Sequence, residues 1–173
     1  MGDLPQPELA REWLATMMLI RRFERSTLDD YRAMLDTNLR SAVEAAFAVL
    51  PSMRERRFGR LVFFGMSGSQ DTLPARGLSF YAAAKAAVVS FTRTLALEEA
   101  KCGITVNAIE PGDIRDKEID RAAAREVAAK NPTGHAGSWE DVSNAVRFLI
   151  SDEAGFINGA VIPVSGGLRE PHE

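Results

Sequence analysis

The sequence predicts an α/β domain in which a parallel sheet is flanked by helices. Segments with apolar residues at helical spacing alternate with short apolar runs of strand-like composition. The chain has 173 residues, of which 46% are hydrophobic and 26% are charged. This length and composition suit one domain with a buried core, without disulfide or metal support.

A long helix is predicted over residues 26–57. Ser26 resembles an N-cap, and Asp29 follows three residues later as the acidic partner of a capping box. Apolar residues then recur at helical spacing up to Pro51. The basic stretch 54–57 is typical of a helix C-terminus, where positive charge stabilises the helix dipole.

Two strands and a second long helix are predicted next. The continuous apolar run Leu61–Phe64 indicates a strand buried on both faces. A helix is predicted over residues 79–101, and Gly103 ends it. Ile104–Ile109 is rich in residues that favour strands and predicts a second strand, which ends at Pro111.

Three more elements are predicted in the C-terminal part. Asp116–Lys130 is rich in alanine and charge, which favours an exposed helix. Ser138 begins another helix, with Glu140 and Asp141 in its first turn. Ala160–Val164 predicts the last strand.

Composition and charge exclude several functional classes. The formal net charge is −3, which gives no broad attraction to nucleic acid or to an anionic membrane. The single Cys102 excludes a disulfide framework within the chain. The apolar run 13–20 is too short to span a bilayer, and we interpret it as a short buried helix. The N-terminal stretch also does not resemble a signal peptide, so we expect a cytoplasmic protein. His135 and His172 lack neighbours at metal-ligand spacing, so we expect no metal.

Tyr81 and Lys85 form the sharpest local feature of the sequence. They are four residues apart, so both side chains project from one face of a helix. A cation beside the phenol would lower the pKa of Tyr81 and suit it to proton transfer. The alternative is an ordinary amphipathic pair without a chemical role.

Polar residues near the predicted strands are further candidates. Ser67 and Ser69 follow the strand Leu61–Phe64, at the edge where parallel sheets place their ligand sites. Either hydroxyl could donate to a substrate carbonyl, or it could simply bond the backbone of its own loop. Asn38 interrupts an apolar helical stripe and needs a partner inside the protein, which most often means a structural hydrogen bond.

The sequence resembles the short-chain dehydrogenase/reductase family over about residues 23–168. Five segments carry the resemblance, in the family's order and at its approximate spacings: DTNLRSAVEAAFAVLPSM, GRLVFFGMSGS, YAAAKAAVVSFTRTLALEEA, GITVNAIEPGDI and GAVIPVSGGL. Among subgroups, the chain is most similar to bacterial 3-oxoacyl-carrier-protein reductases. The resemblance implies a Rossmann-like parallel sheet and NAD or NADP as the cofactor.

The resemblance implies roles for individual residues. Tyr81 would be the general acid that protonates the carbonyl oxygen. Lys85 would lower the pKa of Tyr81 and bond the nicotinamide ribose, and Asn38 would hold a water that links Lys85 to solvent. Three residues match the segment that lies against the nicotinamide: Pro111, Gly112 and Ile114.

The serine of the family pattern has no direct counterpart here. The family places it thirteen residues before the tyrosine, and that position is Gly68 in this chain. Ser67 and Ser69 flank it, and we expect Ser67 to take the role.

The cofactor-binding turn of the family is absent from the sequence. Residues 3–58 contain no glycine, and no G-x-G-x-x-G occurs anywhere in the chain. We therefore expect an incomplete Rossmann-like domain that lacks its first strands: a shortened N-terminal segment, 1–22, and the C-terminal part of the domain, 23–173. The strand Leu61–Phe64 would then lose a neighbour and become an apolar edge.

These observations predict an NAD(P)-dependent oxidoreductase, impaired in cofactor binding. Its substrate would be a small carbonyl or alcohol, acyl thioesters among them. A homo-oligomer is expected through the helices 26–57 and 79–101. The alternatives are a non-catalytic oligomerisation or interaction subunit and an inactive gene fragment of the same family.

Overall fold

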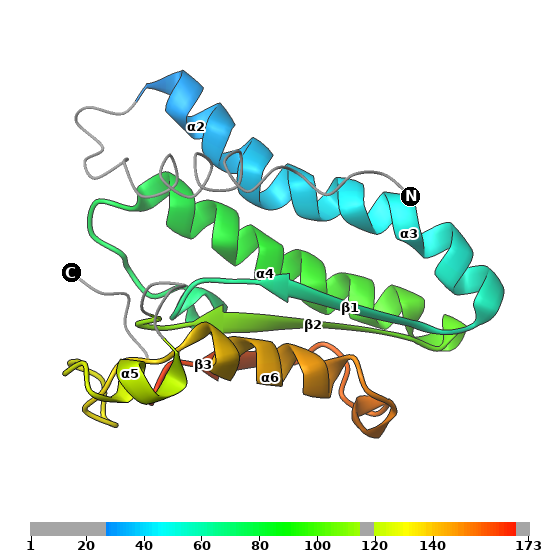
Figure 1. Ribbon diagram of the computed structural model, residues 1–173. Helices are drawn as coiled ribbons and strands as arrows, with labels where there is room; N and C mark the ends of the chain where they lie inside the picture. Colours follow the sequence, from blue (N-terminus) through cyan, green and yellow to red (C-terminus); the bar gives the residue numbers. More distant parts are fainter. Residues whose placement is uncertain (1–26, 115–119, 169–173) are drawn as a thin grey trace.

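A three-stranded parallel sheet organises the part of the chain that the computed structural model describes, residues 27–114 and 120–168. Its strands are β1 (Gly59–Phe64), β2 (Ile104–Pro111) and β3 (Val161–Val164), in the order β1-β2-β3. Helices lie on both faces of the sheet (Figure 1). The predicted α/β fold class with a parallel sheet is confirmed.

One continuous helical rod and one long helix cover the same face of the sheet (Figure 1). The rod consists of α2 (Leu28–Leu35), a π-helical turn (Asp36–Arg40) and α3 (Ser41–Arg56). The long helix, α4 (Ser79–Glu99), continues into a 3₁₀ turn at Ala100–Cys102. The opposite face is covered by α6 (Trp139–Leu149). Three short elements complete the described chain: the 3₁₀ turn Ser69–Asp71, α5 (Arg121–Arg125) and the 3₁₀ turn Asp152–Ala154.

Each face of the sheet has its own hydrophobic core. The first core joins the two long helices to β1 and β2; among its buried members are Leu50, Phe63, Val88, Leu95 and Val106. The second core lies under α6 and is formed by Ile109, Val142 and Leu149. Because β2 is central, its residues from Ile104 to Glu110 are all buried.

The strand β1 is an edge of the described sheet. It pairs only with β2, in register from Gly59 opposite Ile104 to Phe64 opposite Ile109. Phe64 is 41% exposed, and Leu61 and Val62 are half-buried. The prediction of a strand buried on both faces is therefore wrong, whereas the predicted apolar edge is confirmed for this sheet. Burial fails because no described strand covers the outer side of β1.

Two of the helices, α2 and α6, begin with a capping box. Thr27 caps α2: its hydroxyl accepts from the Asp30 amide, and the Asp30 carboxylate accepts from the Thr27 amide. The predicted cap, Ser26, lies outside the described residues. At α6, the predicted cap Ser138 is confirmed, and it forms a second capping box with Asp141.

The predicted helix over Asp116–Lys130 is confirmed in part and is wrong in its C-terminal third. Among the described residues of this range, Arg121–Arg125 is helical and 126–130 are not, while 116–119 lie outside the described residues. Beyond the helix the chain turns back: the Ala136 amide donates to the Val127 carbonyl, and the Ala129 amide donates to the Gly134 carbonyl. The turn that begins at Asn131-Pro132 outweighs the helical preference of the alanines.

The N-terminal predictions are not covered by the structure. The short helix expected over residues 13–20 and the shortened segment 1–22 lie outside the described residues. Of the helices within the described ranges, none combines the length and the hydrophobicity that crossing a bilayer requires.

Candidate active site

The predicted pair Tyr81 and Lys85 lies in the first two turns of α4, beside the carboxyl end of β1. The Lys85 ammonium nitrogen is 5.5 Å from the centre of the Tyr81 ring, within the range of a cation–π contact. Lys85 is only 9% exposed, and its Nζ donates to the carbonyl oxygen of Phe64 at 2.9 Å. The helical spacing therefore brings the two side chains together and directs the ammonium at the last residue of β1.

Burial shifts the pKa values of both groups. It lowers the pKa of Lys85 to about 8, because desolvation disfavours the ammonium. It raises the pKa of Tyr81, because desolvation also disfavours the phenolate. The expectation that Lys85 lowers the pKa of Tyr81 is thus wrong for this structure. Lys85 Nζ is instead directed at the Phe64 carbonyl, and burial is the cause of the Tyr81 shift.

The two candidate serines have different hydrogen bonds. The hydroxyl of Ser69 donates to Glu110 Oε1 at 2.7 Å and accepts from the Met66 amide at 3.1 Å. The hydroxyl of Ser67 donates to the Leu168 carbonyl at 3.4 Å, near the limit for a hydrogen bond. Both side chains are buried, and both lie in the loop that follows β1.

Asn38 lies in the π-helical turn between α2 and α3, and this turn packs against α4. Its side-chain amide donates to the Met34 carbonyl at 2.9 Å and to the Thr37 hydroxyl at 3.1 Å. These are structural bonds within its own helix, as the alternative interpretation expected. A π-helical turn inside a helix often marks a functional site, and the role of Asn38 toward Lys85 stays a prediction.

The segment Pro111–Ile114 leaves the carboxyl end of β2 and passes beside the end of β3. The Gly112 amide donates to the Val164 carbonyl at 3.0 Å. A Cβ at Gly112 would lie 2.6 Å from the Cβ of Ser165, so only glycine permits this approach. Ile114 forms a bridge with Gly137. The predicted site residues that follow β1 and β2 therefore lie at the carboxyl ends of the parallel strands, where such sheets place ligands.

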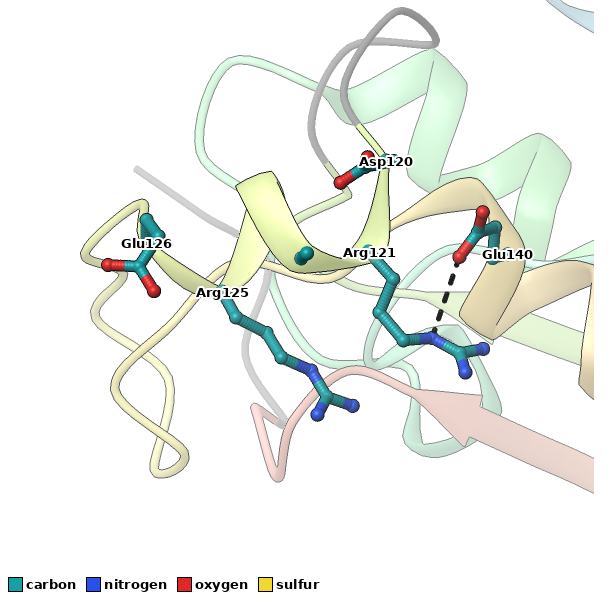
Figure 2. Close-up of a pocket in the computed structure, with 6 residues that line it drawn as sticks. Asp120, Arg121, Arg125, Glu126 and Glu140 are labelled. Atoms are coloured by element: carbon teal, nitrogen blue, oxygen red, sulfur yellow. Dashed lines mark ion pairs between the residues drawn. The ribbon is translucent and has the colours of Figure 1, made fainter.

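Two hollows border the chain after this segment. One has a volume of about 130 Å³, and Ile114, Arg125 and His135 are among its lining residues. The other is an open groove of about 580 Å³ beside α5 (Figure 2), lined by Asp120, Arg121, Ala122, Arg125, Glu126 and Glu140. Neither hollow is lined by Tyr81 or Lys85.

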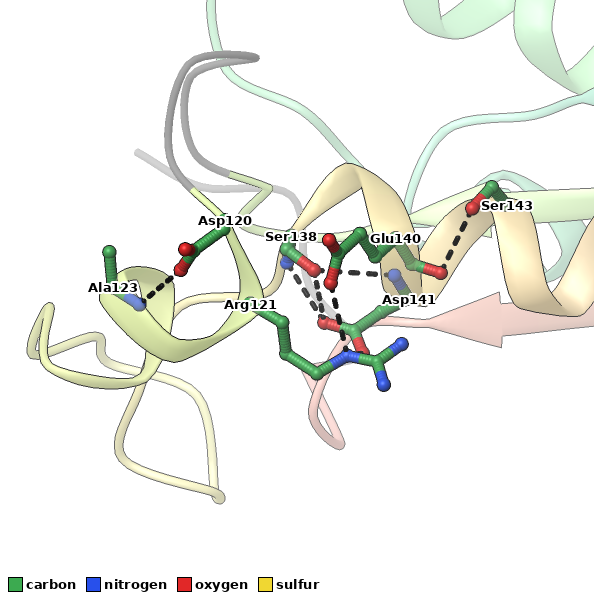
Figure 3. Close-up of polar contacts among 7 residues, drawn as sticks. All are labelled: Asp120, Arg121, Ala123, Ser138, Glu140, Asp141 and Ser143. Carbon is green, nitrogen blue, oxygen red and sulfur yellow. Dashed lines mark hydrogen bonds and ion pairs between the residues drawn. The ribbon is translucent and has the colours of Figure 1, made fainter.

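Arg121 joins α5 to the start of α6 (Figure 3). Its Nε lies 2.8 Å from Asp141 Oδ1 and 3.8 Å from Glu140 Oε2, as ion pairs without hydrogen-bond geometry. The same Asp141 carboxylate accepts from the Ser138 amide and hydroxyl. In the described ranges, no three histidine, cysteine, aspartate or glutamate side chains are arranged to hold a metal ion.

Sequence reasoning missed two polar residues, Glu110 and Arg121. Glu110 is buried at the end of β2 and binds the loop that contains Ser67 and Ser69. An acidic residue at the carboxyl end of a buried strand, directly before Pro111, is the signal that could have identified it. For Arg121 the sequence offers no comparable signal, because basic residues are common on exposed helices.

Comparison with known proteins decides the family. A family model described as enoyl-(acyl carrier protein) reductase matches residues 13–169. The chain belongs to the short-chain dehydrogenase/reductase family. The 3-oxoacyl-[acyl-carrier-protein] reductase FabG of Escherichia coli is 36% identical over 144 residues. That match covers 81% of this short-chain dehydrogenase/reductase and 58% of the relative.

Two solved enzyme structures share this fold over the part that matches. The crystal structure of levodione reductase is 34% identical with a TM-score of 0.73, covering 84% of this chain and 60% of that one. A gluconate 5-dehydrogenase from Burkholderia cenocepacia, in complex with NADP and tartrate, is 28% identical with a TM-score of 0.74. It covers 85% of this chain and 59% of its own. This short-chain dehydrogenase/reductase thus spans about three-fifths of the length of these relatives.

Proposed function

We propose that the site transfers hydride between a nicotinamide cofactor and a small carbonyl or alcohol, with Tyr81 as the acid/base. One observation carries this proposal. Lys85 is buried at the carboxyl end of β1, one helical turn from Tyr81, and its pKa is lowered to about 8. Burying an ammonium opposes folding, and such groups are concentrated at functional sites.

Tyr81 suits the role of a proton donor. Because burial raises the pKa of Tyr81, its phenol is protonated at neutral pH. In carbonyl reduction, a hydride adds to the carbonyl carbon while the Tyr81 hydroxyl gives its proton to the carbonyl oxygen. The phenolate that remains then regains its proton from solvent. Reduction is therefore the direction that the resting protonation state favours.

The residues present fit one half of the cofactor. Lys85 offers an N–H donor at the end of β1, and Pro111, Gly112 and Ile114 pass the end of the neighbouring strand β2. These residues would hold the nicotinamide and its ribose, and NAD or NADP would supply or accept the hydride when bound. For the pyrophosphate half, residues 3–58 offer no glycine for a tight phosphate-binding turn. We infer weak dinucleotide binding and impaired activity.

The substrate class follows from the relatives. FabG of Escherichia coli is named for a 3-oxoacyl thioester substrate, so an acyl thioester is the first candidate for this chain. The cytoplasmic location expected from the sequence belongs to the same proposal.

Titration with NADPH tests cofactor binding. We expect no binding tighter than about 1 mM, which corresponds to about 4 kcal/mol. The measurement is NADPH fluorescence with the purified chain. Micromolar binding that Lys85→Ala abolishes would show instead that the chain forms a complete cofactor site.

Reduction of acetoacetyl-CoA at millimolar NADPH tests the catalytic role. Tyr81→Phe should lower the rate by about 10²–10⁴-fold, because the proton donor is lost while the ring is retained. The matched control is Tyr31→Phe, at the only other tyrosine of the chain, which is 40% exposed. Equal rates for wild type and Tyr81→Phe would contradict the proposal.

A specific observation favours a second candidate, an interaction subunit. Two large apolar side chains on the helices that cover one face of the sheet are exposed: Phe47 on α3 is 75% exposed, and Leu97 on α4 is 80% exposed. Association through these helices would form a homo-oligomer whether or not the site is active. An inactive gene fragment is the remaining alternative, and it would show neither turnover nor association.

A further inference from the structure

Glu110 is a buried carboxylate to which the proposed chemistry gives no role. It occupies the position before Pro111 near the carboxyl end of β2, and it is 1% exposed. A buried carboxylate is costly unless hydrogen-bond donors surround it. The donors around Glu110 all come from the loop that follows β1.

Three hydrogen bonds tie this loop to Glu110. Oε1 accepts from the Ser69 hydroxyl and from the Gln70 amide, both at 2.7 Å. Oε2 accepts from the Gly68 amide at 3.2 Å. All three partners are hydrogen-bond donors. A carboxylate can accept from all of them because both of its oxygens are acceptors, whereas a neutral amide side chain has only one acceptor oxygen. Glu110 therefore fixes three consecutive residues of the loop.

Gly65 permits the close approach of this loop. A Cβ there would lie 2.8 Å from Ser69 Oγ and 3.1 Å from Glu110 Cγ. The Gly65 amide donates to the Ile109 carbonyl at 2.8 Å, which extends the pairing of β1 and β2 by one residue. The end of β1, the loop and the end of β2 thus form one packed unit.

This arrangement gives the two serine hydroxyls different hydrogen bonding. The Ser69 hydroxyl is engaged as donor to Glu110 and as acceptor from Met66, whereas the Ser67 hydroxyl has only the 3.4 Å contact with Leu168. A hydroxyl with one long bond exchanges partners more readily than one held by a carboxylate.

We propose that Glu110 is a positioning residue that fixes the loop 66–70 and keeps Ser69 engaged, so that Ser67 supplies the hydroxyl to the substrate. Its place directly before Pro111 also links this loop to the segment assigned to the nicotinamide. The part that concerns Ser67 rests on the proposed function, whereas the part that concerns the loop does not.

Amide hydrogen exchange of the whole chain, followed by NMR, tests the loop without any activity. Glu110→Gln should accelerate exchange at the Gly68 amide by about tenfold or more, because the NH₂ group of the glutamine would face a backbone N–H donor and could not accept its hydrogen bond. The Gly65 amide, which bonds Ile109 instead, should keep its rate. The matched control is Glu55→Gln, the same change at an exposed side chain of α3. Unchanged exchange at Gly68 in Glu110→Gln would overturn the proposal.

A second variant covers the case in which Glu110→Gln unfolds. Ser69→Ala removes one donor and leaves the carboxylate in place. Exchange at the Met66 amide should accelerate, because its acceptor is lost, while the Gly68 and Gln70 amides stay protected by Glu110. Loss of protection at all three amides would show that Glu110 does not hold the loop.

Turnover of acetoacetyl-CoA at millimolar NADPH decides between the serines. Ser67→Ala should lower kcat by about 10²-fold, the usual cost of removing one donor to a developing oxyanion. Ser69→Ala should cost less than Ser67→Ala, and the reverse order would overturn the assignment of Ser67. If the wild type shows no turnover, the proposed function fails, while the exchange rates still decide the role of Glu110.

Discussion

At the residue scale, Lys85 is the side chain whose placement opposes folding most clearly. It is 9% exposed, and its ammonium donates a hydrogen bond to the Phe64 carbonyl oxygen. No carboxylate contributes to the shift of its pKa, which burial alone lowers to about 8. A methionine would fill the same space without a charge. The lysine is therefore better explained by chemistry than by stability.

Replacing Lys85 with methionine should stabilise the chain in a pH-dependent way. The folded pKa of about 8 lies below the ordinary 10.5, so between these values the unfolded chain binds more protons than the folded chain. The free energy of unfolding then rises with pH across this window, and below about pH 8 the folded state bears the full cost of the ammonium. At pH 7, Lys85→Met should be more stable by about 1–3 kcal/mol, after allowing for the lost hydrogen bond.

Urea unfolding at pH 7 and at pH 10 provides the measurement. The advantage of Lys85→Met over wild type should shrink between pH 8 and 10.5, as the wild-type lysine loses its proton. Lys101→Met is the matched control, because Lys101 is exposed in the turn after α4. A stability difference that stays constant with pH would contradict this explanation.

Residue types and spacing predicted part of the site. Tyr81 and Lys85 were identifiable because helical geometry alone places them on one face. Spacing alone could not distinguish Ser67 from Ser69, because that distinction depends on Glu110, which is 41 residues from Ser69 in the chain. The pKa of Tyr81 was predicted in the wrong direction, since spacing reveals a nearby lysine but not the depth of burial.

At the scale of single elements, the start of α6 illustrates how local sequence determines a helix. Ser138 is 1% exposed, and its hydroxyl accepts from the Asp141 amide at 3.3 Å. The Asp141 carboxylate accepts from the Ser138 amide in return. These bonds satisfy backbone groups that lack partners at a helix N-terminus.

Removing this cap should destabilise the chain by about 1 kcal/mol. We expect Ser138→Ala to lower the thermal unfolding midpoint measured by circular dichroism at 222 nm. Ser143→Ala on the same helix is the control, because its exposed hydroxyl bonds only the Glu140 carbonyl. Equal midpoints for the two variants would mean that the cap contributes nothing beyond a surface serine.

Elements with strong local signals were predicted well, and the exception is instructive. The two long helices and all three strands were located from apolar spacing and from the residues that end them. Within the described part of the range Asp116–Lys130, the helix covers Arg121–Arg125 because contacts with neighbouring segments limit its length. Arg121 binds the start of α6, and Ala128 forms a bridge with His135. Alanine content predicts neither contact.

At the scale of the whole molecule, exposed apolar surface should drive association. Phe64 is 41% exposed at the edge strand, and Phe47 and Leu97 are exposed on the long helices. In sedimentation velocity experiments we expect species larger than a monomer, and Phe47→Lys with Leu97→Lys should shift the distribution toward monomer. Phe156→Ser is the control, because Phe156 is fully exposed at the turn after α6. A wild type that sediments as a monomer at all concentrations would exclude this mode of association.

The register of β1 and β2 also has a consequence for synthesis of the chain. Gly59 pairs with Ile104, 45 positions later, and the whole of α4 lies between them. Parallel strands cannot form as a hairpin, so β1 cannot pair with β2 until β2 has been made. At about 5–20 residues per second, translation delays this pairing by roughly 2–9 s. During this interval the β2 side of the apolar β1 is open to chaperones and to neighbouring polypeptides.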